Sequence, residues 1–163
     1  TTADGAPYAA NDPHLLRWVH VAEVDSFLAA HDRFGEQPLR GDERDEYVAN
    51  AAVIARALGV NAPPESEAAL RDQLHAFRPE LHGTPEARDA ARYLLVEPPL
   101  PLAGRAAYGL IAAAAVATLP RWTRWPLRLP WFPVADATVG RALGDAVTRT
   151  LRWAIVPGDL HTD

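Results

Sequence analysis

Helix-start and helix-stop signals recur along the chain, and no segment alternates apolar and polar residues as a half-buried strand would. Asp12 is an N-cap residue, and the Pro13 that follows suits the first helical position. Gly35 can end the helix that they open. Acids after Gly41 open a second helix, which stops at Gly59. One side of this helix carries an apolar stripe: Tyr47, Ala51, Ile54 and Leu58. The first 60 residues therefore predict two helices joined by a short loop.

The same signals continue through the middle of the chain. Ser66 caps a third helix, which ends before Pro79 because the residue ahead of a proline avoids the α region. Thr84 followed by Pro85 opens a fourth helix, which the segment "EPPLP" breaks. The alanine-rich residues 103–119 form a fifth. The middle of the chain therefore adds three helices.

The C-terminal third is more irregular. Residues 120–134, "PRWTRWPLRLPWFPV", contain too many prolines for one regular helix and predict a short turn and an irregular connection over helix ends. The alternatives are that residues 120–134 lie on a membrane surface or stack on bases, but no basic domain surrounds them. A last helix over 135–157 carries apolar residues at intervals of four: Val139, Leu143, Val147, Leu151 and Ile155. The predicted fold is all-α, an irregular bundle of about six helices in a single domain over residues 1–163.

Composition excludes several classes of function. A net charge of −5 argues against a nucleic-acid partner, which needs a basic footprint. The chain has no cysteine, so thiolate ligands, iron–sulfur clusters and cysteine nucleophiles are excluded. The longest apolar stretch, 106–119, is shorter than the roughly 20 residues of a membrane span and predicts a buried core helix instead. We therefore expect a cytoplasmic protein.

The first helix is apolar on both sides and yet contains His20, Glu23 and Asp25. At 100° per residue, one quarter-turn gathers the following side chains: Leu16, His20, Glu23, Val24, Phe27 and His31. The opposite side carries Leu15, Trp18, Ala22, Asp25 and Ala29. Apolar residues on both sides predict a helix enclosed by its neighbours.

Unpaired ionisable groups in such a helix cost several kcal/mol, so they need partners. His20 and Glu23 are positioned to face each other or a common ligand, and His31 can join them. Asp25 can pair with Arg149 or Arg152 of the last helix. The alternative is purely structural: an imidazole bonded to a backbone carbonyl and a buried Asp–Arg pair. A metal site is weakly indicated, because helical di-iron sites need Glu-x-x-His on two helices.

Other motifs contribute less. His75, His82 and His161 have no partner pattern and are expected to face solvent. The chain contains no Gly-rich phosphate loop, no G-x-S-x-G and no C-x-x-C. The first helix therefore carries the strongest candidate site.

Two adjacent segments, "YAANDPHLLRWVHVAEVDSFLAAHDRFG" and "EQPLRGDERDEYVANAAVIARALGV", resemble the MpaB-type and rubber-oxygenase catalytic domain family. The resemblance continues through "LRDQLHAFRPEL", "TPEARDAARYLLVEPPLPLAGRAAYGLIAAAAVATLP" and "GRALGDAVTRTLRWAIVP". It covers essentially the whole chain in order, and the D-P-x-L-L-x-W-V-H…V-D-S segment is its most specific part.

The resemblance implies an all-α oxidoreductase with haem-dependent oxygenase chemistry on long-chain isoprenoid, apolar substrates. It also implies a preceding segment that supplies the axial haem histidine. We therefore expect this chain to be the C-terminal portion of a longer domain, with the N-terminal portion as its partner and haem b as its cofactor. Glu23 stands where relatives more often carry an apolar residue, which puts a plain haem pocket in doubt.

The resemblance carries over to Trp18, His20 and Asp25. His20 is expected to line the cofactor or substrate cavity, where it would donate to or ligate what binds, with Trp18 as a second cofactor-binding residue. The expected catalytic residues are His20, Glu23 as a proton relay, and Asp25 orienting a partner. Two alternatives remain open: a non-catalytic helical module that binds an apolar ligand, and a non-haem metalloenzyme using His20 and Glu23 with ligands from elsewhere.

Overall fold

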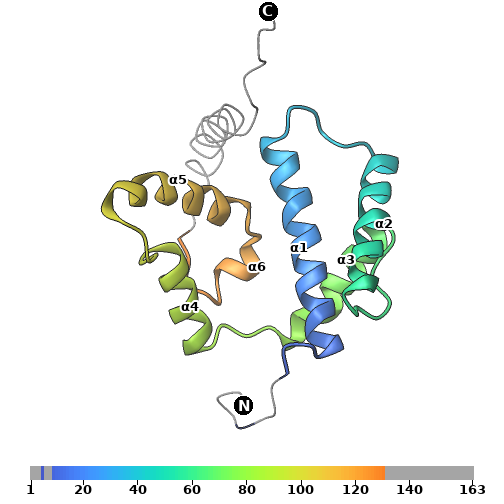
Figure 1. Cartoon of the computed structure of the whole chain (residues 1–163), viewed down its shortest axis with the longest axis horizontal. Coiled ribbons are helices and arrows are strands. Elements are labelled where there is room, and N and C mark those ends of the chain that lie inside the picture. Colours follow the sequence, from blue (N-terminus) through green and yellow to red (C-terminus); the bar gives the residue numbers. More distant parts are fainter. Residues whose placement is uncertain (1–4, 6–8, 131–163) are drawn as a thin grey trace, which may run out of the picture. The chain divides into compact units, whose positions relative to one another are not determined.

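The computed structural model describes Gly5 and residues 9–130, in which helices are joined by loops and turns and no strand occurs (Figure 1). The elements are α1 (Pro13–Phe34), α2 (Gly41–Ala57), α3 (Glu67–Phe77), the 3-10 turn η1 (Arg78–Glu80), α4 (Pro85–Leu95), α5 (Leu102–Thr118) and α6 (Arg121–Arg124). The predicted all-α class is confirmed. The predicted helix over 135–157, with Arg149 and Arg152, lies outside the described residues, as does His161.

The chain divides into two compact units. The first contains the chain up to Asp32 together with Gln37–Leu81, and the second contains Arg33–Glu36 and the chain from His82 onward. The first unit therefore holds most of α1 with α2, α3 and η1, and the second holds α4, α5 and α6.

Three predicted caps form the helix starts. The Asp12 carboxylate accepts hydrogen bonds from two backbone N–H groups of the first turn of α1, at 2.8 and 3.3 Å. The hydroxyls of Ser66 and Thr84 each accept one from the third residue beyond them, at 3.2 Å. Each such cap satisfies an N–H group that the helix leaves free and contributes about 1 kcal/mol. The starts of α1, α3 and α4 are thus set by local chemistry.

Gly59 ends α2 as its position in the sequence predicts. Its φ of +92° lies in the left-handed region, which glycine adopts without a Cβ penalty. The N–H of Gly59 donates to the carbonyl of Arg56 at 3.0 Å, and the N–H of Val60 donates to Ala55 at 2.9 Å. These two bonds form a Schellman cap, which reverses the chain at the end of the helix.

In the first unit, α1 and α2 lie side by side and run antiparallel (Figure 1), and α2 packs on α3. The buried side chains of its core come from all three helices: Val21, Val24, Leu28, Val48, Ala52, Ala55, Leu70, Leu74 and Phe77. Fully burying a side chain such as Leu70 contributes about 1.5–3 kcal/mol.

The prediction that α1 is enclosed on all sides is wrong within the described residues. Val19 and Phe27 are 52% and 53% exposed, although Val21 and Val24 on the same helix are buried. The apolar pattern alone does not give the number of neighbours, and here only part of the surface of α1 is covered. An exposed apolar strip on α1 is the result.

In the second unit, α4 packs on α5, and the Tyr108 hydroxyl donates to the carbonyl of Leu94 at 2.6 Å. Arg124 of α6 is only 5% exposed, because its guanidinium donates to the carbonyls of Leu119 at 2.8 Å and Ala117 at 2.7 Å. These carbonyls end α5, where a positive charge is favourable. The described part of the 120–134 connection thus packs over a helix end, although Trp125 is 88% exposed.

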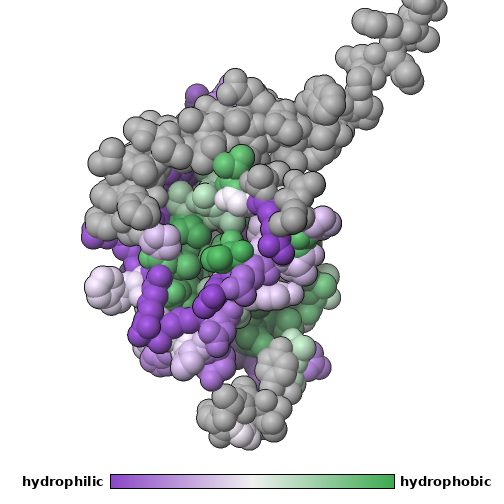
Figure 2. All heavy atoms as spheres, turned by 90° about the vertical axis from the view of Figure 1, so that its left-hand side faces the viewer, coloured by the Kyte–Doolittle hydropathy of each residue, from purple (hydrophilic) through white to green (hydrophobic). Residues whose placement is uncertain are grey.

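The alanine-rich helix α5 is only partly buried, which corrects the prediction of a buried core helix. Ala112, Ala114 and Ala117 are buried, whereas Leu110 and Ile111 are 40% and 46% exposed. The face shown in Figure 2 likewise carries hydrophobic side chains bordered by hydrophilic ones. Among the described residues, no helix combines the length and apolar content that crossing a bilayer requires.

Candidate functional site

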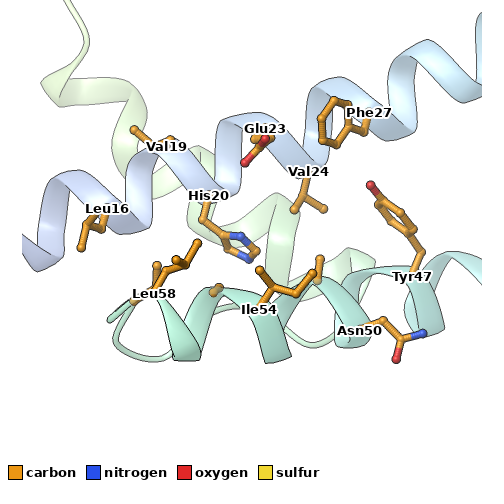
Figure 3. A pocket seen from close by; sticks show the side chains of 13 residues that line it. Leu16, Val19, His20, Glu23, Val24, Phe27, Tyr47, Asn50, Ile54 and Leu58 are labelled. Carbon is orange, nitrogen blue, oxygen red and sulfur yellow. The ribbon is translucent and has the colours of Figure 1, made fainter. Parts of the chain in front are cut away.

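A cavity of about 370 Å³ lies between α1 and α2 within the first unit (Figure 3). Its walls are predominantly apolar, with a few polar side chains, as in most small-molecule sites. The lining side chains come from α1, α2 and the turn that follows α2: Leu16, Val19, His20, Glu23, Val24, Phe27, Tyr47, Asn50, Ala51, Ile54, Ala55, Leu58 and Val60.

Helical spacing brings these residues together. Five of the six side chains that share the predicted quarter-turn of α1 line the cavity, and only the exposed His31 does not. On α2, the predicted apolar stripe that begins at Tyr47 and ends at Leu58 forms the facing wall. The sequence therefore indicated both walls, but not that a void separates them.

His20 is the buried polar group of this site. It is 8% exposed, and Figure 3 shows its ring pointing from α1 toward α2. Its Nε2 is enclosed and has no hydrogen-bond partner among the described residues. Among the described residues, this nitrogen does not make the bond to a backbone carbonyl that the structural alternative proposes. Such an unpaired atom costs about 1–3 kcal/mol and calls for an explanation, of which a bound group is one.

Burial also sets the charge of this imidazole. Desolvation lowers the pKa of His20 below its ordinary value of 6.5, and the negative charge of Glu23 offsets only part of that effect. The ring is therefore neutral at pH 7. A neutral imidazole with a free nitrogen is the form that ligates iron or other metals and that exchanges hydrogen bonds with a substrate.

Glu23 lies one turn beyond His20 and is exposed at the cavity. Burial, and then the charge of Glu23, raise the pKa of Tyr47 on the facing helix. The Tyr47 phenol therefore stays neutral at pH 7, and Glu23 acts electrostatically on side chains of both walls. Tyr47 was expected only as an apolar position, and Asn50 was missed. Their spacing on the α2 stripe, three residues apart, is the signal that could have placed them in the site.

Trp18 does not line the cavity. Its ring packs on Phe77 of α3, with 5.4 Å between the ring centroids and an interplanar angle of 57°. The His14 ring lies 4.9 Å from the same Phe77 ring between centroids, and its Nε2 donates a hydrogen bond to the Glu80 carboxylate at 2.6 Å. Trp18 thus helps to join α1 to α3, away from His20 and Glu23.

Asp25 also lies away from the cavity lining and is half-buried. Burial raises the pKa of its carboxyl group, and the positive charges of nearby arginines oppose that shift only in part. The arginines are Arg44, Arg78 and Arg71. They take the position that the sequence assigned to Arg149 or Arg152, which lie outside the described residues.

Arg44 links three helices beside Asp25. Its guanidinium donates to Asp32 of α1 at 2.6 Å and to both carboxylate oxygens of Glu67 of α3, at 3.0 and 3.1 Å. Arg71 donates to the same carboxylate at 3.0 Å. The bond from Arg44 is the main reason that the pKa of Glu67 is lowered. This network fixes α1 against α2 and α3, and so holds one wall of the cavity.

Within the described part of the chain, no three His, Asp or Glu side chains gather closely enough to hold a metal ion. His20 and Glu23 are the only side chains of these types among the described residues that line the cavity.

Residues 1–153 match the family described as "ER-bound oxygenase mpaB/B'/Rubber oxygenase, catalytic domain". The chain belongs to this family. The match spans both compact units and confirms the resemblance drawn from the D-P-x-L-L-x-W-V-H…V-D-S segment. Comparison with curated proteins and with solved structures gave no significant match. The name of the family supports oxidoreductase activity of the oxygenase type.

Proposed function

We propose that this chain is part of a haem-dependent oxygenase and that the cavity between α1 and α2 holds an apolar substrate beside His20. The observation that carries the proposal is the neutral, enclosed imidazole with an unpartnered Nε2 next to an apolar cavity of about 370 Å³. Membership in a family of oxygenase catalytic domains supports the reaction class. The apolar walls support the substrate class.

The residues of the site fit haem in their donor chemistry. Haem iron is commonly held by a neutral imidazole, and His20 supplies one within apolar walls. His20 would hold the group either as a ligand or through a hydrogen bond, together with a histidine expected from outside this chain. Haem, when bound, supplies the activation of dioxygen.

The protein's own side chains have separate tasks in this proposal. Leu16, Ile54 and Leu58 give the apolar substrate its contacts and so orient it. Glu23 lies within one turn of His20 and can accept or return a proton at the cavity. Asp25 acts from a distance, because it stands beside the Arg44 network that positions α1. Trp18 supports the same helix from the α3 side.

An absorption spectrum with iron analysis of the purified full-length protein tests the proposal. We expect a Soret band and bound iron, both reduced when His20 is changed to Ala. The matched control is His31→Ala, which removes an exposed histidine from the same helix outside the cavity. Unchanged haem occupancy and turnover in His20→Ala would contradict the proposal.

A second candidate is a non-catalytic helical module that binds an apolar ligand. It is favoured by the apolar walls and by the single imidazole that the described residues bring to the cavity. It predicts neither a Soret band nor bound metal, with the apolar ligand retained. A non-haem metalloenzyme, the third reading, predicts bound metal without a Soret band, and it needs ligands beyond His20 and Glu23.

Two expectations about context also remain predictions. Cell fractionation tests the cytoplasmic location, and co-purification with the N-terminal portion tests that portion as the partner of this chain.

A further inference from the structure

The cavity between α1 and α2 is elongated and differs at its two ends. Leu16 and Phe27, which lie at opposite ends of its α1 wall, are about 16 Å apart along the helix at 1.5 Å per residue. Because α1 and α2 run antiparallel, Leu58 lies near the Leu16 end, whereas Tyr47 and Asn50 lie near the Phe27 end (Figure 3). The cavity thus has an apolar end and an end with hydrogen-bonding groups.

Glu23 gives this cavity its charge. It is the one charged side chain among the described residues that line it, since no arginine takes part in the lining and the His20 imidazole is neutral. Figure 3 shows Glu23 on α1 between the two ends. An anionic group entering the cavity would meet repulsion from the carboxylate without a compensating cation. A cationic group would meet attraction.

The Glu23 carboxylate suits a group with several N–H donors. An ammonium group carries three donors and no acceptor. The Glu23 carboxylate belongs to the lining and can accept hydrogen bonds from such a group, and water can accept from its remaining donors. Glu23 and Asn50 are exposed, so the charged group can keep part of its hydration while the apolar chain lies along Leu16 and Leu58.

We propose that the cavity selects elongated apolar molecules that end in a primary ammonium group, and that Glu23 is the residue that determines this selectivity. The inference rests on the proposed function only in that it requires the cavity to hold an apolar ligand; it requires neither haem nor turnover. The proposal also gives a role to Glu23, which stands where relatives more often carry an apolar residue.

Three probes of equal chain length separate the head group from the chain: dodecylamine, dodecanol and dodecanoate. Their binding to the full-length protein is measured by calorimetry below the aggregation concentration of each probe, at neutral pH and low salt. We expect dodecylamine to bind about tenfold more tightly than dodecanoate, with dodecanol between them, because attraction and repulsion at a partly exposed carboxylate each change affinity by a few-fold. The ratio should shrink as salt is added.

Glu23→Gln should bring the three affinities together while dodecanol binding stays unchanged, which also shows that the variant is folded. Glu46→Gln is the matched control, because it removes an exposed carboxylate from α2 outside the cavity lining and should keep the tenfold ratio. Equal affinities in the unmodified protein, or a ratio that survives Glu23→Gln, would overturn the selectivity and leave the apolar cavity standing. If none of the probes binds, both the selectivity and the proposed apolar-substrate site fail.

Discussion

Replacing His20 by Leu should stabilise the ligand-free protein, although most substitutions of buried residues destabilise. The imidazole is 8% exposed, and its Nε2 is enclosed without a partner among the described residues. Removing an unpaired buried polar atom raises the free energy of unfolding by about 1–3 kcal/mol, and the change of side-chain shape lowers it by up to about 1.5 kcal/mol. We therefore expect the free energy of unfolding to rise by about 1 kcal/mol and the Tm to rise by about 2–4 °C.

The pH dependence of this effect follows from the lowered pKa of His20. Below pH 6.5 the unfolded chain binds a proton at this residue that the folded protein does not bind until the pH is lower still. With respect to this group, the folded protein is therefore most stable above pH 6.5, where the ring is neutral. It loses stability as the pH falls below that value. His20→Leu removes this loss, so the variant's advantage should grow between pH 7 and pH 5.

Urea unfolding of the ligand-free full-length protein, followed by circular dichroism at several pH values, measures both effects. His31→Leu serves as the control, because His31 is exposed and its replacement should change the unfolding free energy by no more than about 0.5 kcal/mol. A loss of 2 kcal/mol or more in His20→Leu, or an advantage that shrinks toward pH 5, would refute the reasoning. Either result would mean that the imidazole has a partner that holds it in the folded protein.

Three further substitutions test the described structure of the two units by urea unfolding. Gly83→Ala should destabilise the protein by about 1–3 kcal/mol, because the new Cβ would collide with the backbone oxygen of Pro126. Gly104→Ala, whose Cβ meets nothing within 4 Å, should leave the stability unchanged. Equal effects of the two substitutions would contradict this prediction. Asp25→Asn should stabilise the protein at pH 7. The raised pKa of Asp25 means that, above pH 3.8, burying the charged carboxyl group costs more free energy than its attraction to the arginines supplies. Destabilisation at pH 7 would show that this attraction dominates. Ser66→Ala should cost about 1 kcal/mol through the loss of the α3 cap, and an unchanged unfolding midpoint would argue against that cap.

The sequence predicted the helices well because their ends depend on neighbouring residues. Asp12, Ser66 and Thr84 cap the N–H groups of the turn that follows them, and Gly59 adopts its left-handed φ within the chain reversal it forms. Helical spacing likewise placed His20 and Glu23 on one stripe. None of these inferences needs information about distant parts of the chain.

What the sequence did not give depends on long-range packing. Trp18 and Asp25 share the predicted stripe opposite His20. The placement of α3 decides that Trp18 contacts Phe77, and the placement of α2 decides that Asp25 lies near Arg44. Asn50 escaped notice because an exposed amide on a helix is ordinary, and only the packing of α1 against α2 makes it part of a cavity lining. The same holds for the exposure of Val19, which the apolar pattern alone predicted to be covered.

Nitrogen NMR of the histidine rings in the full-length protein tests most directly whether the His20 imidazole contacts the bound haem. Before haem is added, the ring of His20 should give the signals of a neutral imidazole at pH 7. On addition of haem, those signals should shift or broaden strongly while those of His31 stay in place. A protonated His20 ring at pH 7, or His20 signals that remain unchanged while haem binds, would contradict the account.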